Sequence, residues 1–170
     1  IKLTKIEGNP ASHFGFNGYS TEKIYQVSQT HTADAILFQL TKVDHPYTKK
    51  WITTDEDIRS YNQLIQQGHS FGAVEAGEIK GWIICEYREW NNSLFIENIL
   101  VSEKHRRKGT GQKLIESVIT QAGKLQCRLV ELETQNTNLP AIEFYQKNNF
   151  EITGINQKLY TGTDRNEIAL

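Results

Sequence analysis

Residues 106–111, Arg-Arg-Lys-Gly-Thr-Gly, stand between an apolar segment at 94–101 and a segment at 110–124 whose apolar residues recur with helical spacing. A strand, a basic turn that contains glycine and then a helix form a common binding site for a pyrophosphate. The glycines let the main chain approach the anion, and the first turn of the helix offers N–H groups that lack acceptors, together with the positive end of the helix dipole. The three cationic side chains can neutralise phosphate charge. The turn therefore predicts a site for a phosphate-containing ligand.

The turn fits neither of two well-known phosphate motifs. The sequence contains no G-x-x-x-x-G-K-[ST] loop and no G-x-G-x-x-G fingerprint with an acidic residue downstream. Its pattern is R-x-x-G-x-G, from Arg106 to Gly111. Taken alone, these six residues are as compatible with an ordinary loop that caps a helix as with a phosphate site.

The composition is that of an ordinary globular protein. The 170 residues carry a formal net charge of −1, and 38% of them are hydrophobic. This charge argues against a protein that binds nucleic acid or a membrane surface through bulk charge. No apolar run approaches the ~20 residues of a membrane span, and the first residues do not resemble a signal peptide. Cys85 and Cys127 are expected to be reduced thiols in a cytoplasmic protein, and the five scattered histidines lack the spacing of a metal site.

The order of the expected elements describes a mixed α/β domain. A helix is expected from its cap Thr54, with Asp57 in an imperfect capping box, to Gly68. Short turns then join three antiparallel strands, and a further helix leads to a strand that returns parallel to the third. These elements are expected at 70–75, 79–88, 94–101, 110–124 and 127–134, followed by a helix at 139–148 and one or two terminal strands. The prediction is a mixed, mostly antiparallel sheet flanked by helices on both faces.

The first part of the chain is harder to interpret. Residues 1–30 are polar and form an arm or an opening strand. The apolar run at 34–40 is too short to separate strand from helix. Residues 43–51, which contain Pro46, are expected to form a loop.

A second motif follows in the strand and helix after the turn. Its parts are Glu133, Asn138, Ala141, Phe144-Tyr145 and Asn149-Phe150. Together the two motifs resemble those of the GCN5-related N-acetyltransferase (GNAT) superfamily, whose turn binds the pyrophosphate of acetyl-CoA. The family usually has glycine where Asn149 stands, but asparagine also adopts the left-handed conformation that this turn needs. The resemblance implies the GNAT acyl-CoA N-acyltransferase fold and an acetyl-CoA-dependent N-acetyltransferase.

Within the superfamily, the chain resembles the streptothricin acetyltransferases over about residues 80–170 and only vaguely before that. The segments that carry this resemblance are Trp90–Asn92, Phe95–Ile99, Leu132–Gln135, Asn138–Leu139 and Leu159–Tyr160. It implies antibiotic resistance by acetylation of a primary amine on a cationic small molecule, with the β-lysine amine of streptothricin as the first choice. The amine would attack acetyl-CoA directly in a ternary complex.

The same resemblance implies a single domain over residues 1–170. Residues up to about 68 would form the acceptor side, and residues from about 69 would form the acetyl-CoA-binding core. Acetyl-CoA is the implied cosubstrate and a small cationic amine the implied partner, with no metal, nucleic acid or membrane involved. Dimers are common in the superfamily, so a homodimer is compatible with the resemblance.

The resemblance also assigns residues to acetyl-CoA. The main chain of Ile99, Leu100 and Val101 would bind the pantetheine arm beside a bulge that opens the sheet. An N–H of Leu100 or Val101 would polarise the thioester carbonyl. Asn138 would either contact CoA or cap the helix that begins near Leu139. The residues assigned to the pyrophosphate are Arg106, Arg107, Lys108, Gly109, Thr110 and Gly111.

Amide formation needs a neutral amine, a donor for the oxyanion and an acid for the leaving thiolate. Tyr145 is the candidate acid, because the family has a tyrosine there that points at the CoA sulfur; the alternative is an aromatic core residue. Glu97 and Glu133 are candidate bases, because each is a carboxylate in an apolar strand. Each could instead face solvent or pair with Arg88 or Arg128.

Two other functions remain open from the sequence. The same chemistry could serve a protein N-terminus or lysine, a polyamine or an aminoglycoside. A non-catalytic acyl-CoA-binding sensor would keep the turn without turning the thioester over. The intact turn together with Tyr145 argues against the sensor.

Overall fold

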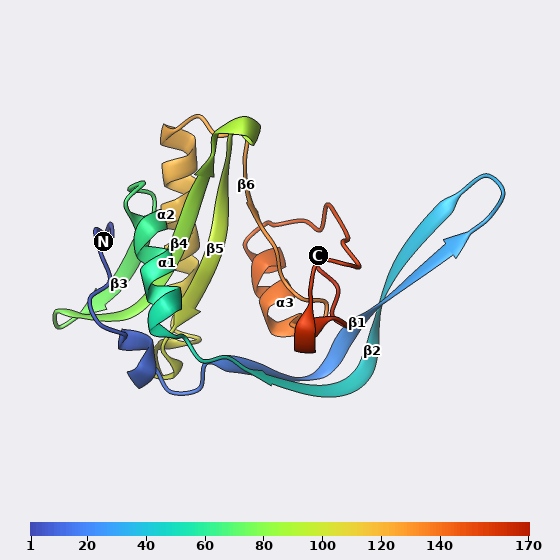
Figure 1. Cartoon of the computed structure of the whole chain (residues 1–170), viewed down its shortest axis with the longest axis horizontal. Coiled ribbons are helices and arrows are strands. Elements are labelled where there is room, and N and C mark those ends of the chain that lie inside the picture. The colour runs from blue at the N-terminus through green and yellow to red at the C-terminus, as the bar shows by residue number, and fades with distance from the viewer. The chain divides into compact units, whose positions relative to one another are not determined.

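The computed structural model describes all residues from 1 to 170 and divides them into two compact units. Residues 1–17 and 50–132 form one, which we call the sheet unit, and residues 18–49 and 133–170 form the other, which we call the hairpin unit. The ribbon in Figure 1 traces the chain from its blue N-terminus to its red C-terminus. None of the helices has the length and apolar character that crossing a membrane requires.

The sheet unit contains four strands in the order β3 (Phe71–Glu75), β4 (Glu78–Arg88), β5 (Ser93–Val101) and β6 (Leu129–Leu132). The first three are antiparallel neighbours, whereas β6 pairs parallel to β5. The predicted antiparallel meander followed by a parallel strand is confirmed. β6 is shorter than the expected strand at 127–134, because its ladder with β5 is only four residue pairs long.

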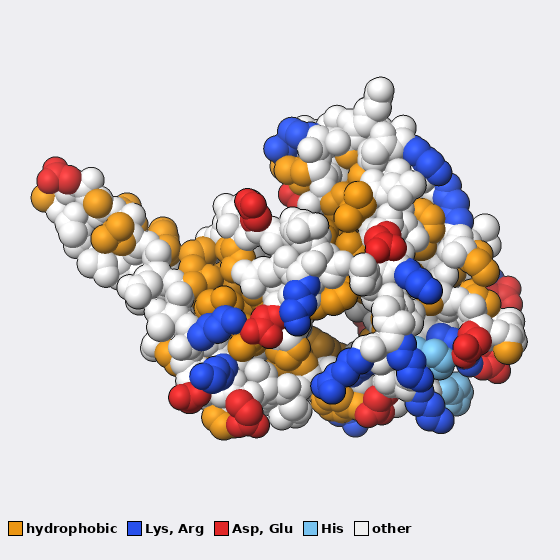
Figure 2. Space-filling view, turned by 180° about the vertical axis from the view of Figure 1, so that it is seen from behind, with side chains coloured by type: hydrophobic (Ala, Val, Ile, Leu, Met, Phe, Trp, Pro, Cys, Tyr) orange, Lys and Arg blue, Asp and Glu red, His pale blue; other side chains and the backbone are white.

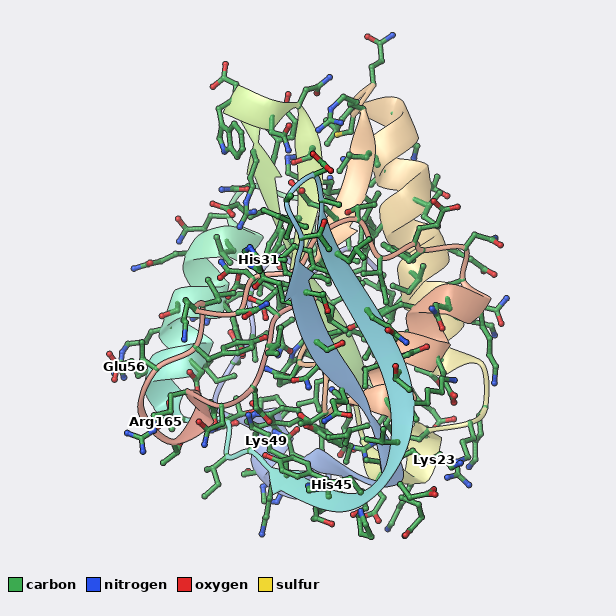
Figure 3. The ribbon with its side chains drawn as sticks, turned by 90° about the vertical axis from the view of Figure 1, so that its right-hand side faces the viewer. Lys23, His31, His45, Lys49, Glu56 and Arg165 are labelled. Atoms are coloured by element: carbon green, nitrogen blue, oxygen red, sulfur yellow. The ribbon has the colours of Figure 1, made fainter.

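Two helices cover the sheet. α1 (Asp55–Ile65) and α2 (Thr110–Lys124) lie on opposite faces of it, as Figures 1 and 3 show from two directions. Thr54 caps the start of α1, as predicted. The Thr54 hydroxyl accepts a hydrogen bond from the N–H of Asp57 at 3.1 Å, and the Asp57 carboxylate accepts one from the N–H of Thr54 at 2.7 Å. This capping box satisfies N–H groups that the start of a helix leaves open.

The core of the sheet unit is built on both faces of the sheet. Trp82 is fully buried on the α1 side, with its ring centroid 5.3 Å from that of Phe14 and 6.4 Å from that of Tyr61. Ile119 is one of the apolar residues that recur with helical spacing in α2, and it is 48% exposed because it lies at the edge of the apolar stripe. The residues that α2 buries are Leu114, Ile115, Val118 and Ala122.

The hairpin unit begins with two long strands, β1 (Gly18–His31) and β2 (Ile36–Lys50), which form a two-stranded sheet. The prediction of a loop at 43–51 is therefore wrong, since the strand runs through Pro46. Each strand of a two-stranded sheet has an open edge, where the missing N–H of proline costs no ladder hydrogen bond. Figure 2 shows apolar surface toward the tip of the hairpin, and its most exposed residues are Ile36, Leu37 and Phe38.

α3 (Leu139–Lys147) and the C-terminal segment complete the hairpin unit. After α3, Asn149 adopts the left-handed conformation that the sequence predicted, with a φ of 65°. The expected terminal strands do not form, because the segment is polar and lacks an alternating apolar face. Only isolated bridges pair Ala169 with Gln135 and with Asn156. Short 3-10 turns lie at Pro10–His13, Glu89–Asn91, Glu103–His105 and Gly162–Asp164.

Candidate functional site

A bulge in β5 opens the sheet unit next to the basic turn. The register between β4 and β5 shifts between Ile84 and Cys85, and Glu97 is the extra residue on β5. The ladder between β5 and β6 ends at Ile96, immediately before the bulge. Beyond it, β5 continues to Val101 without β6 beside it. The main chain at the end of β5 is therefore released from the parallel strand.

The end of β5 directs one N–H away from β4. Main-chain groups alternate between the two edges of a strand, and the N–H of Ser102, the next residue, donates to the Lys80 carbonyl of β4 at 2.8 Å. The N–H and carbonyl of Val101 therefore point to the opposite side. The Val101 carbonyl accepts a hydrogen bond from Nε of Arg106 at 3.0 Å. Of the two donors predicted for the thioester, the N–H of Val101 faces the open edge and that of Leu100 faces β4.

The turn at 106–111 ends in an open helix start. Gly109 is the N-cap of α2 with a φ of 80°, and no side chain caps the helix. The first helical hydrogen bond runs from the N–H of Lys113 to the Gly109 carbonyl at 3.0 Å. The helix therefore supplies no acceptor for the N–H groups of Thr110, Gly111 and Gln112. These donors and the helix dipole suit this end of α2 to an anion.

His105 anchors the segment that leads into the turn. Its Nδ1 lies 2.8 Å from the Ser102 hydroxyl, and its Nε2 lies 2.9 Å from the Glu75 carboxylate. The hydrogen bond from His105 lowers the pKa of the exposed Glu75 carboxyl. These contacts connect the turn to β3 and hold the residue before Arg106 in place.

The three cations of the turn have different surroundings. The guanidinium of Arg106 is partly buried and donates to the Phe16 carbonyl at 2.5 Å as well as to the Val101 carbonyl. Arg107 and Lys108 are exposed. Arg106 therefore fixes the end of β5 to the turn, a contact that the sequence did not reveal, and the side chains open to solvent are those of Arg107 and Lys108.

Glu97 lies on β5 at the bulge, with its side chain exposed. The two arginines that were considered as its partners make other contacts. Arg88 forms an ion pair with Glu86 at 2.8 Å, and Arg128 donates to Asn91 at 2.6 Å. The Glu97 carboxylate therefore lies at the start of the part of β5 that has no β6 beside it.

Asn138 and Tyr145 belong to the hairpin unit. The Asn138 side chain caps α3 by accepting a hydrogen bond from the N–H of Ala141 at 3.3 Å, so the cap interpretation is realised. Tyr145 lies against Phe144 and Phe150, with ring centroids 5.4 and 5.8 Å apart. Burial raises the pKa of the Tyr145 phenol well above its usual value. The phenol therefore keeps its proton at neutral pH, as a proton donor must.

Glu133 follows the last residue of β6 and is exposed, so the expectation that it lies inside an apolar strand is wrong. The strand ends earlier because its partner β5 bulges away. The Glu133 carboxylate accepts a hydrogen bond from the hydroxyl of Tyr160. Burial, and secondly this hydrogen bond, raise the pKa of Tyr160. The irregular C-terminal segment offers no sequence pattern that could have paired these two residues.

A buried carboxylate in the same unit also escaped the sequence analysis. Glu167 is 5% exposed and accepts hydrogen bonds from Thr137 at 2.8 Å and from Tyr47 at 2.9 Å. It pairs with the ammonium group of Lys49, which also lies 2.9 Å from Asp164. Figure 3 labels Lys49 on β2. Because its charge is paired and hydrogen-bonded within the chain, Glu167 has a structural role in tying the hairpin to the C-terminal segment.

Comparison with known proteins identifies the family to which the chain belongs. The model of the Acetyltransferase (GNAT) family matches residues 35–150. The chain belongs to the GNAT family of acetyltransferases. It is an acetyl-CoA-dependent N-acetyltransferase, and the predicted α/β GNAT fold is confirmed.

Two relatives of this GNAT enzyme are streptothricin acetyltransferases. The protein of Streptomyces lavendulae is 37% identical over 156 residues, which make up 88% of this chain and 80% of the relative. The protein of Escherichia coli is 32% identical over 149 residues, or 86% of this chain and 78% of the relative. A solved structure from Bacillus anthracis, assigned as a streptothricin acetyltransferase in complex with acetyl coenzyme A, is 27% identical. It covers 97% of this chain and 93% of its own, with a TM-score of 0.71.

The predicted site residues of this GNAT enzyme fall into two groups. The sheet unit holds Glu97, the end of β5 and the basic turn, and the structure brings these together through the bulge and the contacts of Arg106. The hairpin unit holds Glu133, Asn138 and Tyr145.

Proposed function

We propose that this GNAT enzyme acetylates a primary amine of a cationic small molecule, and that streptothricin is the acceptor. The choice of acceptor is supported by the two streptothricin acetyltransferases, which align with most of the chain. Acetylation removes the positive charge of the amine. A single transfer would thereby remove a charge with which the antibiotic binds its target.

The open start of α2 is the observation that carries the acetyl-CoA part of the proposal. The N–H groups at 110–112 bind the pyrophosphate, and the exposed Arg107 and Lys108 neutralise its charge. Arg106 holds this turn against the end of β5. The pantetheine arm pairs with the main chain of 99–101, along the edge of β5 that has no β6 beside it. Asn138, whose oxygen caps α3, offers its amide group to CoA.

The acetyl transfer is direct. The amine nitrogen attacks the thioester carbonyl, a C–N bond forms, and the C–S bond breaks when the tetrahedral intermediate collapses. The N–H of Val101 stabilises the oxyanion, since it faces the open edge of β5. Tyr145, which is neutral at the pH of the reaction, gives its proton to the leaving thiolate, so that CoA leaves as a thiol.

A carboxylate accepts the proton that the amine loses, directly or through water. The candidates are Glu97 and Glu133, both exposed and both able to attract a cationic amine. Glu97 lies at the bulge of β5, and Glu133 is held by Tyr160. One of the two carboxylates can bind the cationic acceptor while the other accepts its proton.

The test is the release of CoA thiol from acetyl-CoA with a panel of amines. The panel contains streptothricin, a polyamine, an aminoglycoside, and peptides with a free N-terminus or lysine. We expect rapid release with streptothricin at a micromolar KM and little with the others. Release only with another amine would show that streptothricin is not the acceptor. Binding of acetyl-CoA without release by any amine would favour a sensor instead.

A further inference from the structure

Tyr160 contacts a candidate base, yet no step of the proposed mechanism uses it. Its hydroxyl donates a hydrogen bond to the carboxylate of Glu133, which is 27 residues away in the sequence. Glu133 is exposed, whereas Tyr160 is partly buried in the C-terminal segment. A long exposed side chain is otherwise free to change rotamer, and a fixed donor on a packed ring removes that freedom.

We propose that Tyr160 is a positioning residue, which holds the Glu133 carboxylate in one orientation for proton transfer from the acceptor amine. The inference rests on the proposed function, because it concerns the base of that reaction. Tyr160 therefore acts through Glu133 and needs no contact with either substrate.

The surroundings of Tyr160 keep it a donor. The ionisable groups that face it are Glu133, Glu167 and Tyr19, and all of them oppose the loss of its proton. Burial, the largest cause, raises its pKa in the same direction. The carboxylate of Glu167 is already paired with Lys49, so it does not compete for the Tyr160 hydroxyl. Across the neutral range, Tyr160 therefore keeps its proton and can donate a hydrogen bond to Glu133.

The test measures kcat against pH for wild type, Tyr160→Phe, Glu133→Gln and the double variant. Removing the hydroxyl should lower kcat about tenfold, which is a smaller loss than removal of a general base would cause. The KM for acetyl-CoA should not change. In the Glu133→Gln background, Tyr160→Phe should have no further effect.

Tyr25→Phe is the matched control. It removes the same hydroxyl from a partly buried tyrosine of the same unit, whose ring lies 5.5 Å from the ammonium group of Lys42 rather than beside an acid. Its pH profile should match that of wild type. Glu133→Asp serves as a second variant, because it keeps a carboxylate but draws it back from the Tyr160 hydroxyl, and it should lower kcat as Tyr160→Phe does.

Two contrary results are distinguishable. An equal loss from Tyr160→Phe with and without Glu133 would overturn the positioning role alone and leave the proposed base in place. An unchanged kcat in Glu133→Gln would remove Glu133 from the mechanism, and the role of Tyr160 would fall with it.

Discussion

Tyr145 combines a phenol that keeps its proton with a ring fixed between two phenylalanines. If it protonates the leaving thiolate, Tyr145→Phe should lower kcat by about 10²-fold, within the range for loss of a general acid. The loss should appear at every pH of the assay, because the raised pKa keeps the wild-type phenol protonated throughout. The KM for acetyl-CoA should stay the same, since the ring remains. A kcat that equals wild type across pH would make Tyr145 a packing residue.

The two candidate bases can be separated by isosteric substitution. Glu97→Gln and Glu133→Gln each remove a charge without changing the size of the side chain. Loss of the base should lower kcat by about 10²-fold, whereas loss of an attracting charge should raise only the KM for the acceptor. Because Tyr160 holds Glu133, we expect the fall in kcat there and the rise in KM at Glu97. A fall in kcat at Glu97 and a rise in KM at Glu133 would instead identify Glu97, at the β5 bulge, as the base.

Some single residues could be interpreted correctly from the sequence alone. The cap at Thr54 and the left-handed Asn149 follow from local chemistry, and the structure confirms them. For Asn138 the sequence left a cap and a CoA contact open, and the structure shows the cap. The contacts of Arg106 and Glu167 could not be predicted, because their partners lie far away in the sequence and form no repeating pattern. Sequence patterns report local geometry better than they report which distant groups the fold brings together.

The bulge in β5 is the element on which the proposed acetyl-CoA site depends, and Gly81 of β4 is packed against the strand beyond it. A Cβ at Gly81 would lie 2.8 Å from the Leu100 carbonyl oxygen and 3.2 Å from the Cα of Val101. Gly81→Ala should therefore push β5 away from β4 at a cost of about 1–3 kcal/mol. We expect a lower melting temperature and a higher KM for acetyl-CoA, measured by thermal unfolding and by thiol release.

Gly123→Ala is the control for this change. Gly123 lies in α2, and a Cβ there would meet nothing within 4 Å. Alanine should raise stability by about 0.5–1 kcal/mol, because glycine is a poor residue for a helix. The KM for acetyl-CoA should be that of wild type. If Gly81→Ala left the KM unchanged while lowering stability, the end of β5 would not bind the pantetheine arm.

Elements with a strong periodic pattern were predicted correctly, and those without one were not. The strands and helices of the sheet unit from Thr54 to Lys124 agree with the sequence because each has apolar spacing, a cap or a short turn. The second strand of the hairpin was missed because Pro46 and several lysines resemble a loop. A two-stranded sheet tolerates both, since each strand has an edge in water.

At the scale of the whole molecule, the proposed functions are distributed over both units. The groups proposed to bind acetyl-CoA lie mainly in the sheet unit, and the proposed acid and one proposed base lie in the hairpin unit. The order of the sequence concealed this division, because the hairpin unit combines residues 18–49 with residues 133–170. The family and the reaction class could be predicted from two motifs, whereas the acceptor depends on surfaces that carry no such motif.

The most direct test of the central claim is the mass of the product formed from acetyl-CoA and streptothricin. The account predicts streptothricin that carries one additional acetyl group, placed on its β-lysine amine by fragmentation, and formed in step with the release of CoA. Omission of either substrate should abolish this product. Unmodified streptothricin in a reaction that releases CoA, or a product acetylated elsewhere than on an amine, would contradict the account.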